Sequence, residues 1–264
     1  YMPKCIKKVI VFDLDDTIGH FEEISMFLGG LQAIVSSSIT DTYIFNLLDL
    51  WPKFLRPGIF DILEMIKKQK RKNKCVKAII YTNNMGPRSW TLLIKRYLEK
   101  KIKSPIFDKV ITAYRPEQKN NCRTSHNKSY RDLLRCTGYN NNDEFIFLDD
   151  QYHPYMKHPK ITYLHLVPYN YGMQFNNMIN TFIHSKYGSI IKKKHLDRFK
   201  SYMFKFLSSG NAANRYIIKR SKIHKKDIQQ LRLIKKEMKK FLNIKNTRNK
   251  KKKKRSKSKT RKNK

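Results

Sequence analysis

Short apolar runs alternate with longer amphipathic segments along the first two thirds of the chain. The runs are rich in Val, Ile, Leu and Phe and have the length of strands buried on both faces. The segments between them place apolar residues at helical spacing, as Ile59, Ile62 and Ile66 do. This alternation predicts an α/β fold with a doubly wound parallel sheet. The expected strands lie at about 6–13, 76–81, 107–113, 145–148 and 161–167, and the expected helices at about 59–72, 87–101 and 128–136.

Two regions depart from the alternation. Residues 19–55 form a connection too long for a simple loop and include an apolar stretch at 43–51, so we expect a small cap or flap there. Beyond about Tyr187 the pattern becomes helical and basic. We therefore expect three parts, which are a main domain at 1–186, a basic helical extension at 187–245 and a disordered polybasic tail at 246–264.

The basic extension contains an apolar stripe at helical spacing, with lysines on its other side. We expect this helix to dock on the main domain, and the alternative is that it lies on nucleic acid or on a membrane surface. The stripe consists of Ile228, Leu231, Ile234, Met238 and Phe241.

Polar side chains follow three of the predicted strands at the point where each strand ends. The carboxyl ends of parallel strands share one edge of a sheet, so these side chains should converge there. Carboxylates held together repel one another unless a cation lies between them or one keeps its proton. A hard cation such as Mg²⁺, together with a phosphoryl group, would satisfy such an arrangement. The side chains are Asp13 and Asp15, Thr82 and Asn83, and Asp149 and Asp150.

The charge is distributed unevenly along the chain. Residues 1–150 hold 25 Lys and Arg against 17 Asp and Glu, whereas residues 151–264 hold 33 against 3. The tail at 246–264 alone contains 12 Lys and Arg and no acid. This predicts polyanionic partners, which are nucleic acid, an acidic protein or anionic lipid. The tail itself is a candidate nuclear-localisation or nucleic-acid-binding segment.

Cys5, Cys75, Cys122 and Cys136 are scattered and form no C-x-x-C pair. We expect reduced thiols in a reducing intracellular compartment, nuclear or associated with nucleic acid. The abundance of Lys, Asn and Ile is typical of an AT-rich genome, and a viral protein in a host cell fits this composition. No apolar run approaches about 18 residues, so we expect no transmembrane segment.

The segment Asp13-Leu14-Asp15-Asp16-Thr17 resembles the first motif of the haloacid-dehalogenase-like (HAD) phosphohydrolases. Thr82 and the pair Asp149-Asp150 match the second and fourth motifs of that superfamily in order. The third motif is a lysine upstream of the fourth. Lys128, which opens a predicted helix 21 positions before Asp149, is our candidate for it, and Lys119 is the second candidate.

Within the superfamily, residues 6 to about 170 resemble the FCP/SCP group, the carboxy-terminal-domain phosphatases that are also called NLI-interacting-factor-like. The resemblance rests on 13–18, on Arg56-Pro57-Gly58, on 128–133 and on the strand-end motifs. Asp16 replaces a usual Glu, Asn83-Asn84 replaces small residues, and Gln151-Tyr152-His153-Pro154 replaces a usual Ser-Pro. These departures leave the hydrolytic machinery intact and bear on the substrate.

The resemblance implies a Mg²⁺-dependent phosphomonoester hydrolase that works through an aspartyl-phosphate. Asp13 would attack phosphorus, and Asp15 would protonate the leaving oxygen and then deprotonate water. Mg²⁺ would bind a carboxylate oxygen of Asp13, the backbone carbonyl of Asp15 and a motif-four acid, Asp150 or Asp149. The phosphoryl oxygens would be held by Thr82, Asn83 and Lys128, and Arg56 would contact substrate or cap the following helix.

The substrate that the resemblance implies is a phosphoserine or phosphothreonine protein. One alternative is a phosphatase that acts on phosphorylated nucleic-acid ends, which the basic half of the chain favours. Another is a catalytically idle HAD scaffold that binds nucleic acid or a protein partner. The presence of both Asp13 and Asp15 disfavours the idle scaffold. We expect His153 and His158, each beside a proline, to be loop residues and not metal ligands.

Overall fold

The computed structural model describes residues 5–35, 38–118, 121–209 and 223–244 and contains a five-stranded, all-parallel sheet. The strand order is β3-β2-β1-β4-β5. This is the α/β, Rossmann-like arrangement that the alternation of strands and helices predicts. The strands are β1 (Lys8–Phe12), β2 (Val76–Tyr81), β3 (Lys109–Ile111), β4 (Glu144–Asp149) and β5 (Ile161–His165).

Strand β1 is the centre of the sheet and pairs with β2 on one side and with β4 on the other. Its residues Val9, Ile10 and Val11 are completely buried, which is why the run contains no polar position. The strand order reverses at β1, because the chain first builds β2 and β3 on one side and then crosses to β4. Open sheets of this kind bind ligands at the carboxyl ends of the strands beside such a reversal.

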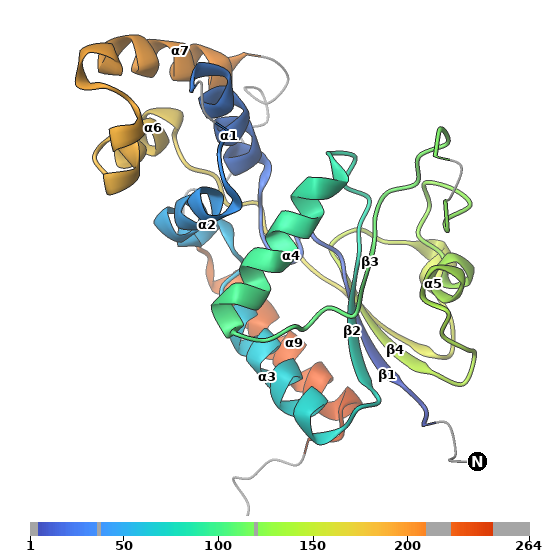
Figure 1. Ribbon diagram of the computed structural model, residues 1–264. Helices are drawn as coiled ribbons and strands as arrows, with labels where there is room; N and C mark the ends of the chain where they lie inside the picture. The colour runs from blue at the N-terminus through green and yellow to red at the C-terminus, as the bar shows by residue number, and fades with distance from the viewer. Residues whose placement is uncertain (1–4, 36–37, 119–120, 210–222, 245–264) are drawn as a thin grey trace, which may run out of the picture.

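Two hydrophobic cores cover the two faces of the sheet. On one face lie α3 (Ile59–Lys72), α4 (Arg88–Ile102) and α9 (Lys225–Phe241), whose apolar residues join Ile10 and Phe12 of β1. On the other face α5 (Tyr130–Thr137) covers a smaller core around Val9 and Val11. Figure 1 shows α5 on the opposite side of the sheet from α3, α4 and α9.

The predicted insertion at 19–55 folds as α1 (Glu22–Ile34), α2 (Asp41–Leu50) and the short 3₁₀ helix η1 (Pro52–Phe54). Helix α1 packs against α7 (Leu196–Ser208), and α7 packs against α6 (Phe175–Ile183). Phe27 of α1 meets Trp51 and Phe182 with ring centroids 4.9 and 5.1 Å apart. The insertion therefore shares a helical layer with segments from the carboxyl-terminal part of the chain, at one end of the molecule (Figure 1).

The apolar stripe of α9 docks on the sheet domain from Leu231 onward, as its spacing predicts, whereas its first member, Ile228, is 39% exposed. Ile234 and Met238 are completely or almost completely buried, and the Lys8 ammonium donates to the Phe241 carbonyl at 2.6 Å. Gly58, which precedes α3 with φ of +74°, lies so close to Leu231 of α9 that a Cβ at that position would clash. One core thus includes residues from both sides of the expected boundary at 186.

The polybasic tail at 246–264 and the second motif-three candidate, Lys119, lie outside the described residues. None of the helices in the described ranges combines the length and the apolar character needed to cross a membrane.

The expectation of reduced thiols differs from the structure, in which the cysteines form disulfides between Cys5 and Cys75 and between Cys122 and Cys136. This pairing is at odds with a reducing compartment. Cys5 and Cys75 precede β1 and β2, whose parallel register places Lys8 beside Val76, so the two cysteines meet at the same end of neighbouring strands. Their separation of 70 residues hid this proximity from a reading of cysteine spacing alone.

Docking of α9 should contribute strongly to stability. Replacing Met238, whose exposure is 0%, with Ala leaves a cavity and should lower the free energy of unfolding by about 2–5 kcal/mol. Urea denaturation of the whole chain measures this loss. Lys239→Ala, at the exposed neighbouring position of the same helix, is the matched control and should change stability by less than about 0.5 kcal/mol. Equal effects of both substitutions would contradict the docking.

Candidate functional site

The loop after β1 holds the first pair of acids at the carboxyl edge of the sheet. The Asp13 amide donates to the Leu148 carbonyl at 2.9 Å, which extends the pairing of β1 and β4 past the end of β1. Asp16 has φ of +55°, in the left-handed region, and its amide donates to the Gly19 carbonyl at 2.8 Å. The chain turns sharply here, so Asp13 and Asp15 stay at the edge where the strand order reverses.

A lysine ammonium joins carboxylates from the two central strands. Lys128 Nζ lies 2.5 Å from Asp13 Oδ1 and 2.6 Å from Asp149 Oδ2, and all three residues are buried. Asp150 accepts a hydrogen bond from the Thr17 hydroxyl at 3.1 Å. Within the described residues, Asp13, Asp149 and Asp150 form a group whose ligand oxygens all lie within 4.8 Å of one another.

The carboxylates of this group differ in proton affinity. Burial raises the pKa of Asp13 to about 8, and the Lys128 ammonium opposes that rise. Burial and the charge of Asp149 raise the pKa of Asp150 to about 6. Burial acts in the same direction on Asp149, but His153 and Lys128 outweigh it and lower the pKa of Asp149. Three carboxylates share one ammonium here, so a further cation would relieve their repulsion.

A cavity of about 150 Å³ opens at these groups. It is smaller than the pockets that hold drug-sized ligands and suits a phosphoryl group with a cation. Burial raises the pKa of Asp15, whose Oδ2 accepts a hydrogen bond from the Asn84 side-chain amide at 2.6 Å. The buried Thr82 hydroxyl accepts from the Asn84 backbone amide at 3.0 Å. The cavity is lined by Asp13, Asp15, Asp16, Thr82, Asn83, Asn84, Lys128, Asp149, Asp150 and Gln151.

Arg123 holds the loop after β2 in place, a role that no pattern in the sequence indicates. Its guanidinium is buried and donates to the Asn83 side-chain oxygen at 2.8 Å and to the His126 carbonyl at 2.8 Å. It also lies over the Tyr81 ring, with 5.0 Å between the guanidinium carbon and the ring centroid. These contacts occupy the Asn83 side-chain oxygen, and Asn83 still lines the cavity.

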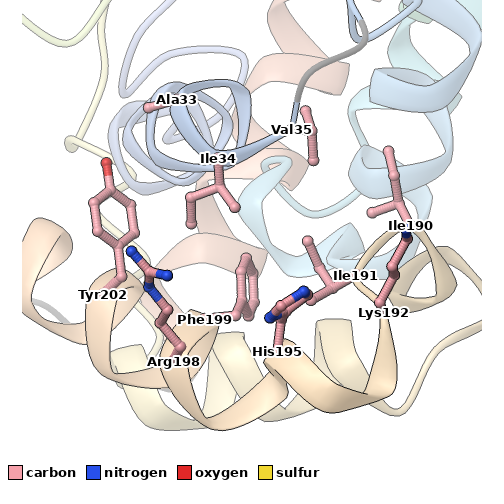
Figure 2. Close-up of a pocket in the computed structure, with 10 residues that line it drawn as sticks. All are labelled: Ala33, Ile34, Val35, Ile190, Ile191, Lys192, His195, Arg198, Phe199 and Tyr202. Carbon is pink, nitrogen blue, oxygen red and sulfur yellow. The ribbon is translucent and has the colours of Figure 1, made fainter.

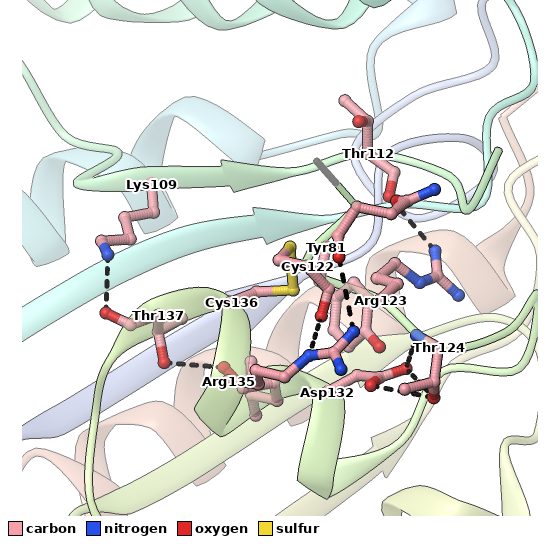
Figure 3. Close-up of a disulfide and its surroundings, with 12 residues drawn as sticks. Tyr81, Lys109, Thr112, Cys122, Arg123, Thr124, Asp132, Arg135, Cys136 and Thr137 are labelled. Carbon is pink, nitrogen blue, oxygen red and sulfur yellow. Dashed lines mark hydrogen bonds between the residues drawn. A yellow bond between two sulfur atoms is a disulfide. The ribbon is translucent and has the colours of Figure 1, made fainter. Parts of the chain in front are cut away.

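The segment that carries Arg123 and Lys128 is closed by the Cys122–Cys136 disulfide, which links it to α5. Figure 3 shows this disulfide beside Arg123 and beside the hydrogen bonds between Thr124 and Asp132. Ser129 caps α5 by accepting from the Asp132 amide at 3.1 Å. Lys128 therefore lies directly before a capped helix, inside the loop that the disulfide closes. Both constraints hold its ammonium between Asp13 and Asp149.

Arg56 lies behind the site and is not among the residues that line the cavity. Its guanidinium is buried and donates to the backbone carbonyls of Thr17 at 2.6 Å, Asp16 at 2.5 Å and Val167 at 2.9 Å. Burial lowers the pKa of Arg56 to about 10, so it stays charged at neutral pH. Arg56 thus holds the loop after β1 to the segment after β5.

Besides Arg123 and the lining residue Asp16, three further lining or supporting residues escaped the sequence interpretation. Asn84 and Gln151 line the cavity, and His153 Nε2 lies 3.2 Å from Asp149 Oδ2. His153 is a loop residue, as we expected, but it touches the carboxylate that Lys128 also holds. Closeness in sequence to a motif could have identified these three residues, because each lies within four residues of Thr82 or Asp149.

The donor set fits a hard divalent cation. Carboxylate oxygens are the ligands that Mg²⁺ prefers, and Mg²⁺ commonly uses one or two of them together with phosphate oxygens and water. The second carboxylate oxygen of Asp13 accepts no hydrogen bond from the described residues, and Asp150 accepts one from the Thr17 hydroxyl through a single oxygen. The Asp15 carboxylate stands outside the group of three and instead bonds to Asn84.

A second, larger cavity of about 690 Å³ lies between α1 and α7, away from the strand ends. Figure 2 shows Ile34 of α1 and Phe199 of α7 pointing into the space between the helices, with Arg198 and His195 beside them. Its lining contains no carboxylate, so it lacks the oxygen ligands and the carboxylate nucleophile that the cavity at the strand ends offers. We place the candidate active site at the smaller cavity.

Scans of the chain against protein-family models, curated proteins and solved structures find no match. The interpretation of the site therefore depends on the chain's own residues and their geometry.

Stability should depend on pH through His20, which supports the site loop from behind. His20 is buried, with Nδ1 2.5 Å from Asp16 Oδ1 and Nε2 3.1 Å from Glu23 Oε2. Burial opposes the imidazolium, but these carboxylates raise the pKa of His20 to about 9. Because that exceeds the unfolded value of about 6.5, the contribution is complete below about pH 6.5 and disappears as pH rises through about 9.

Chemical denaturation between pH 6 and 10 should show this loss, on the order of 3 kcal/mol. In His20→Asn that part of the pH dependence should be absent. His195→Asn, at an exposed position before α7, should keep the wild-type profile. A His20→Asn protein with the full wild-type pH profile would contradict the assignment.

Proposed function

We propose that this chain is a Mg²⁺-dependent phosphomonoester hydrolase of the HAD type that forms an aspartyl-phosphate on Asp13. The observation that carries the proposal is the convergence of Asp13, Asp149 and Asp150 within 4.8 Å, with the Lys128 ammonium joining two of them. The strand order supports it, because the group lies at the carboxyl edge where the order reverses.

In the first half-reaction an oxygen of Asp13 attacks phosphorus, and the bond between phosphorus and the leaving oxygen breaks. Asp15 gives its proton to the leaving oxygen. Burial raises the pKa of Asp15, and this favours the protonated form that a general acid needs. In the second half-reaction water attacks the phosphorus of the aspartyl-phosphate and passes a proton to Asp15, so that phosphate leaves and both carboxyl groups return to their starting states.

Charge moves onto the phosphoryl oxygens during both transfers, and fixed donors should stabilise it. Lys128 supplies a buried ammonium, and Thr82 supplies a hydroxyl that lines the cavity. Bound Mg²⁺ would neutralise phosphoryl charge and favour the ionised form of Asp13. Asp13 and Asp150 are the residues we assign to holding it, with Asp149 held in place by Lys128 and His153.

The substrate class is a separate question from the chemistry. A phosphoserine or phosphothreonine protein is the substrate that the resemblance to the FCP/SCP group implies, and a phosphorylated nucleic-acid end is the second candidate. The formal net charge of +38 favours a polyanionic substrate or partner. Turnover of a phosphoserine peptide, a 3′-phosphorylated oligonucleotide and an aryl phosphate, measured side by side, would rank them.

Replacing Asp13 with Asn should abolish phosphatase activity while the protein stays folded, because an amide cannot form the aspartyl-phosphate. We expect a loss of at least about 10³-fold in kcat on an aryl phosphate. The matched control is Asp197→Asn, since that carboxylate on α7 is fully exposed and outside the site. Substantial turnover by a purified, folded Asp13→Asn protein would refute the nucleophile assignment.

Activity should also require a divalent cation. Excess chelator should stop turnover, and Mg²⁺ should restore it, because the site holds more carboxylates than its lysine can balance. Beryllium fluoride with Mg²⁺ should inhibit by mimicking the phosphorylated Asp13, and it should raise the melting temperature of wild-type protein more than that of Asp13→Asn. Full activity in excess chelator would show that the three carboxylates act without a metal.

A further inference from the structure

An exposed aromatic surface lies next to the candidate active site. Tyr152 directly follows Gln151, which lines the catalytic cavity, and 57% of the Tyr152 surface is exposed. Its ring is parallel to that of Tyr163 on β5, with centroids 5.9 Å apart and planes 5° apart. The His165 ring meets Tyr152 edge-on at 6.1 Å. We call Tyr152, Tyr163 and His165 the aromatic surface.

This surface is bonded to the loop that carries the metal-site acids. The Tyr163 hydroxyl donates to the Gln151 carbonyl at 2.7 Å and accepts from the His153 amide at 2.8 Å. His165 Nε2 shares a hydrogen bond with the Asp150 carbonyl at 2.9 Å. Tyr163 and His165 are two positions apart on β5, and side chains at this spacing face the same side of the sheet. These hydrogen bonds therefore hold the rings in a fixed position relative to the carboxylates at the end of β4.

A stacked ring with more than half of its surface exposed is available to a planar partner. A neighbouring residue provides a comparison, because Tyr155 is 66% exposed and has no ring partner among the described residues. Tyr152 differs in that its ring is oriented by stacking, which lowers the entropy lost when another flat group binds. The Gln151–Pro154 segment that includes Tyr152 is also where the sequence departs from the FCP/SCP pattern.

We propose that the aromatic surface is a nucleobase-stacking subsite, and that the substrate is the phosphorylated end of a single-stranded nucleic acid. This inference rests on the proposed phosphatase function and names its substrate class. The terminal phosphate would enter the cavity at Asp13, and the adjoining base would stack on Tyr152. Proteins that bind single strands combine such aromatic faces with positive charge along the backbone path.

Charge distinguishes this substrate from a phosphopeptide. The chain carries 58 Lys and Arg against 20 Asp and Glu, and most of that excess lies after residue 150. A nucleic acid offers one phosphate per nucleotide to this field, whereas a phosphopeptide offers a single phosphoryl group unless it is acidic elsewhere. Every base has a flat face, so the subsite would act with little dependence on sequence.

The test compares oligonucleotides of one length that end in a phosphate and differ only in whether the terminal nucleotide carries a base or is abasic. Both 3′- and 5′-phosphorylated versions are measured at one salt concentration. Wild-type protein should have a lower KM for the base-bearing end. In Tyr152→Ala this preference should fall by roughly 5- to 150-fold, the range that follows from losing one stacked base.

Two further variants separate stacking from a structural role. Tyr152→Phe keeps the ring and should retain the preference for the base. Tyr155→Ala removes a more exposed ring in the same segment and should leave that preference intact. Loss of turnover in Tyr152→Ala that is equal for base-bearing, abasic and phosphoserine-peptide substrates would assign Tyr152 to holding the loop and would overturn the proposal.

A binding measurement tests the subsite without turnover. In the Asp13→Asn protein, the fluorescence of 2-aminopurine placed at the phosphorylated end should be quenched on binding, and Tyr152→Ala in that background should remove the quenching. Quenching without phosphatase activity in wild-type protein would keep the subsite and refute the proposed function. Two outcomes would overturn the subsite and keep the proposed phosphatase function. One is phosphatase activity without base preference or quenching. The other is a loss of turnover in Tyr152→Ala that is largest for the phosphoserine peptide.

Discussion

The buried ammonium of Lys128 between Asp13 and Asp149 is the interaction on which the site depends. A buried carboxylate without a partner is costly, and this edge of the sheet brings three of them together. Removing one partner of such a buried pair costs about 3–5 kcal/mol, because the other charge is left uncompensated. Much of the local structure serves to place this ammonium, including the cap by Ser129 and the Cys122–Cys136 disulfide.

The part of the site that the sequence could predict is the part that the strands determine. Apolar runs reveal strands, and the polar residue after each run marks its end. A parallel sheet then places those ends on one edge, so Asp13, Thr82 and Asp149 converge without any knowledge of the loops. Lys128 was a candidate because the resemblance calls for a lysine upstream of Asp149, at the start of a helix that Gly138 stops, and the structure places it directly before the Ser129 cap.

The remainder depends on contacts that no periodic pattern encodes. We expected Arg56 to contact substrate or to cap the following helix, and the structure adds a contact that no pattern indicates, because the segment after β5 brings the Val167 carbonyl to its guanidinium. The role of Arg123 depends on an irregular loop that returns to Asn83. The disulfides were missed because spacing along the chain does not report that Cys5 and Cys75 precede paired strands. Loops and long-range pairings thus set the limit of sequence interpretation.

The electrostatics of the whole chain and of the site oppose each other. The chain carries a formal charge of +38, while its candidate site gathers Asp13, Asp15, Asp149 and Asp150 around one lysine. The wider field would concentrate polyanions near the molecule, but a phosphate dianion entering the cavity would meet net negative charge there. A divalent cation reverses that local sign and leaves the wider field unchanged. In this arrangement a metal would be required for phosphate to enter as well as for phosphate to react.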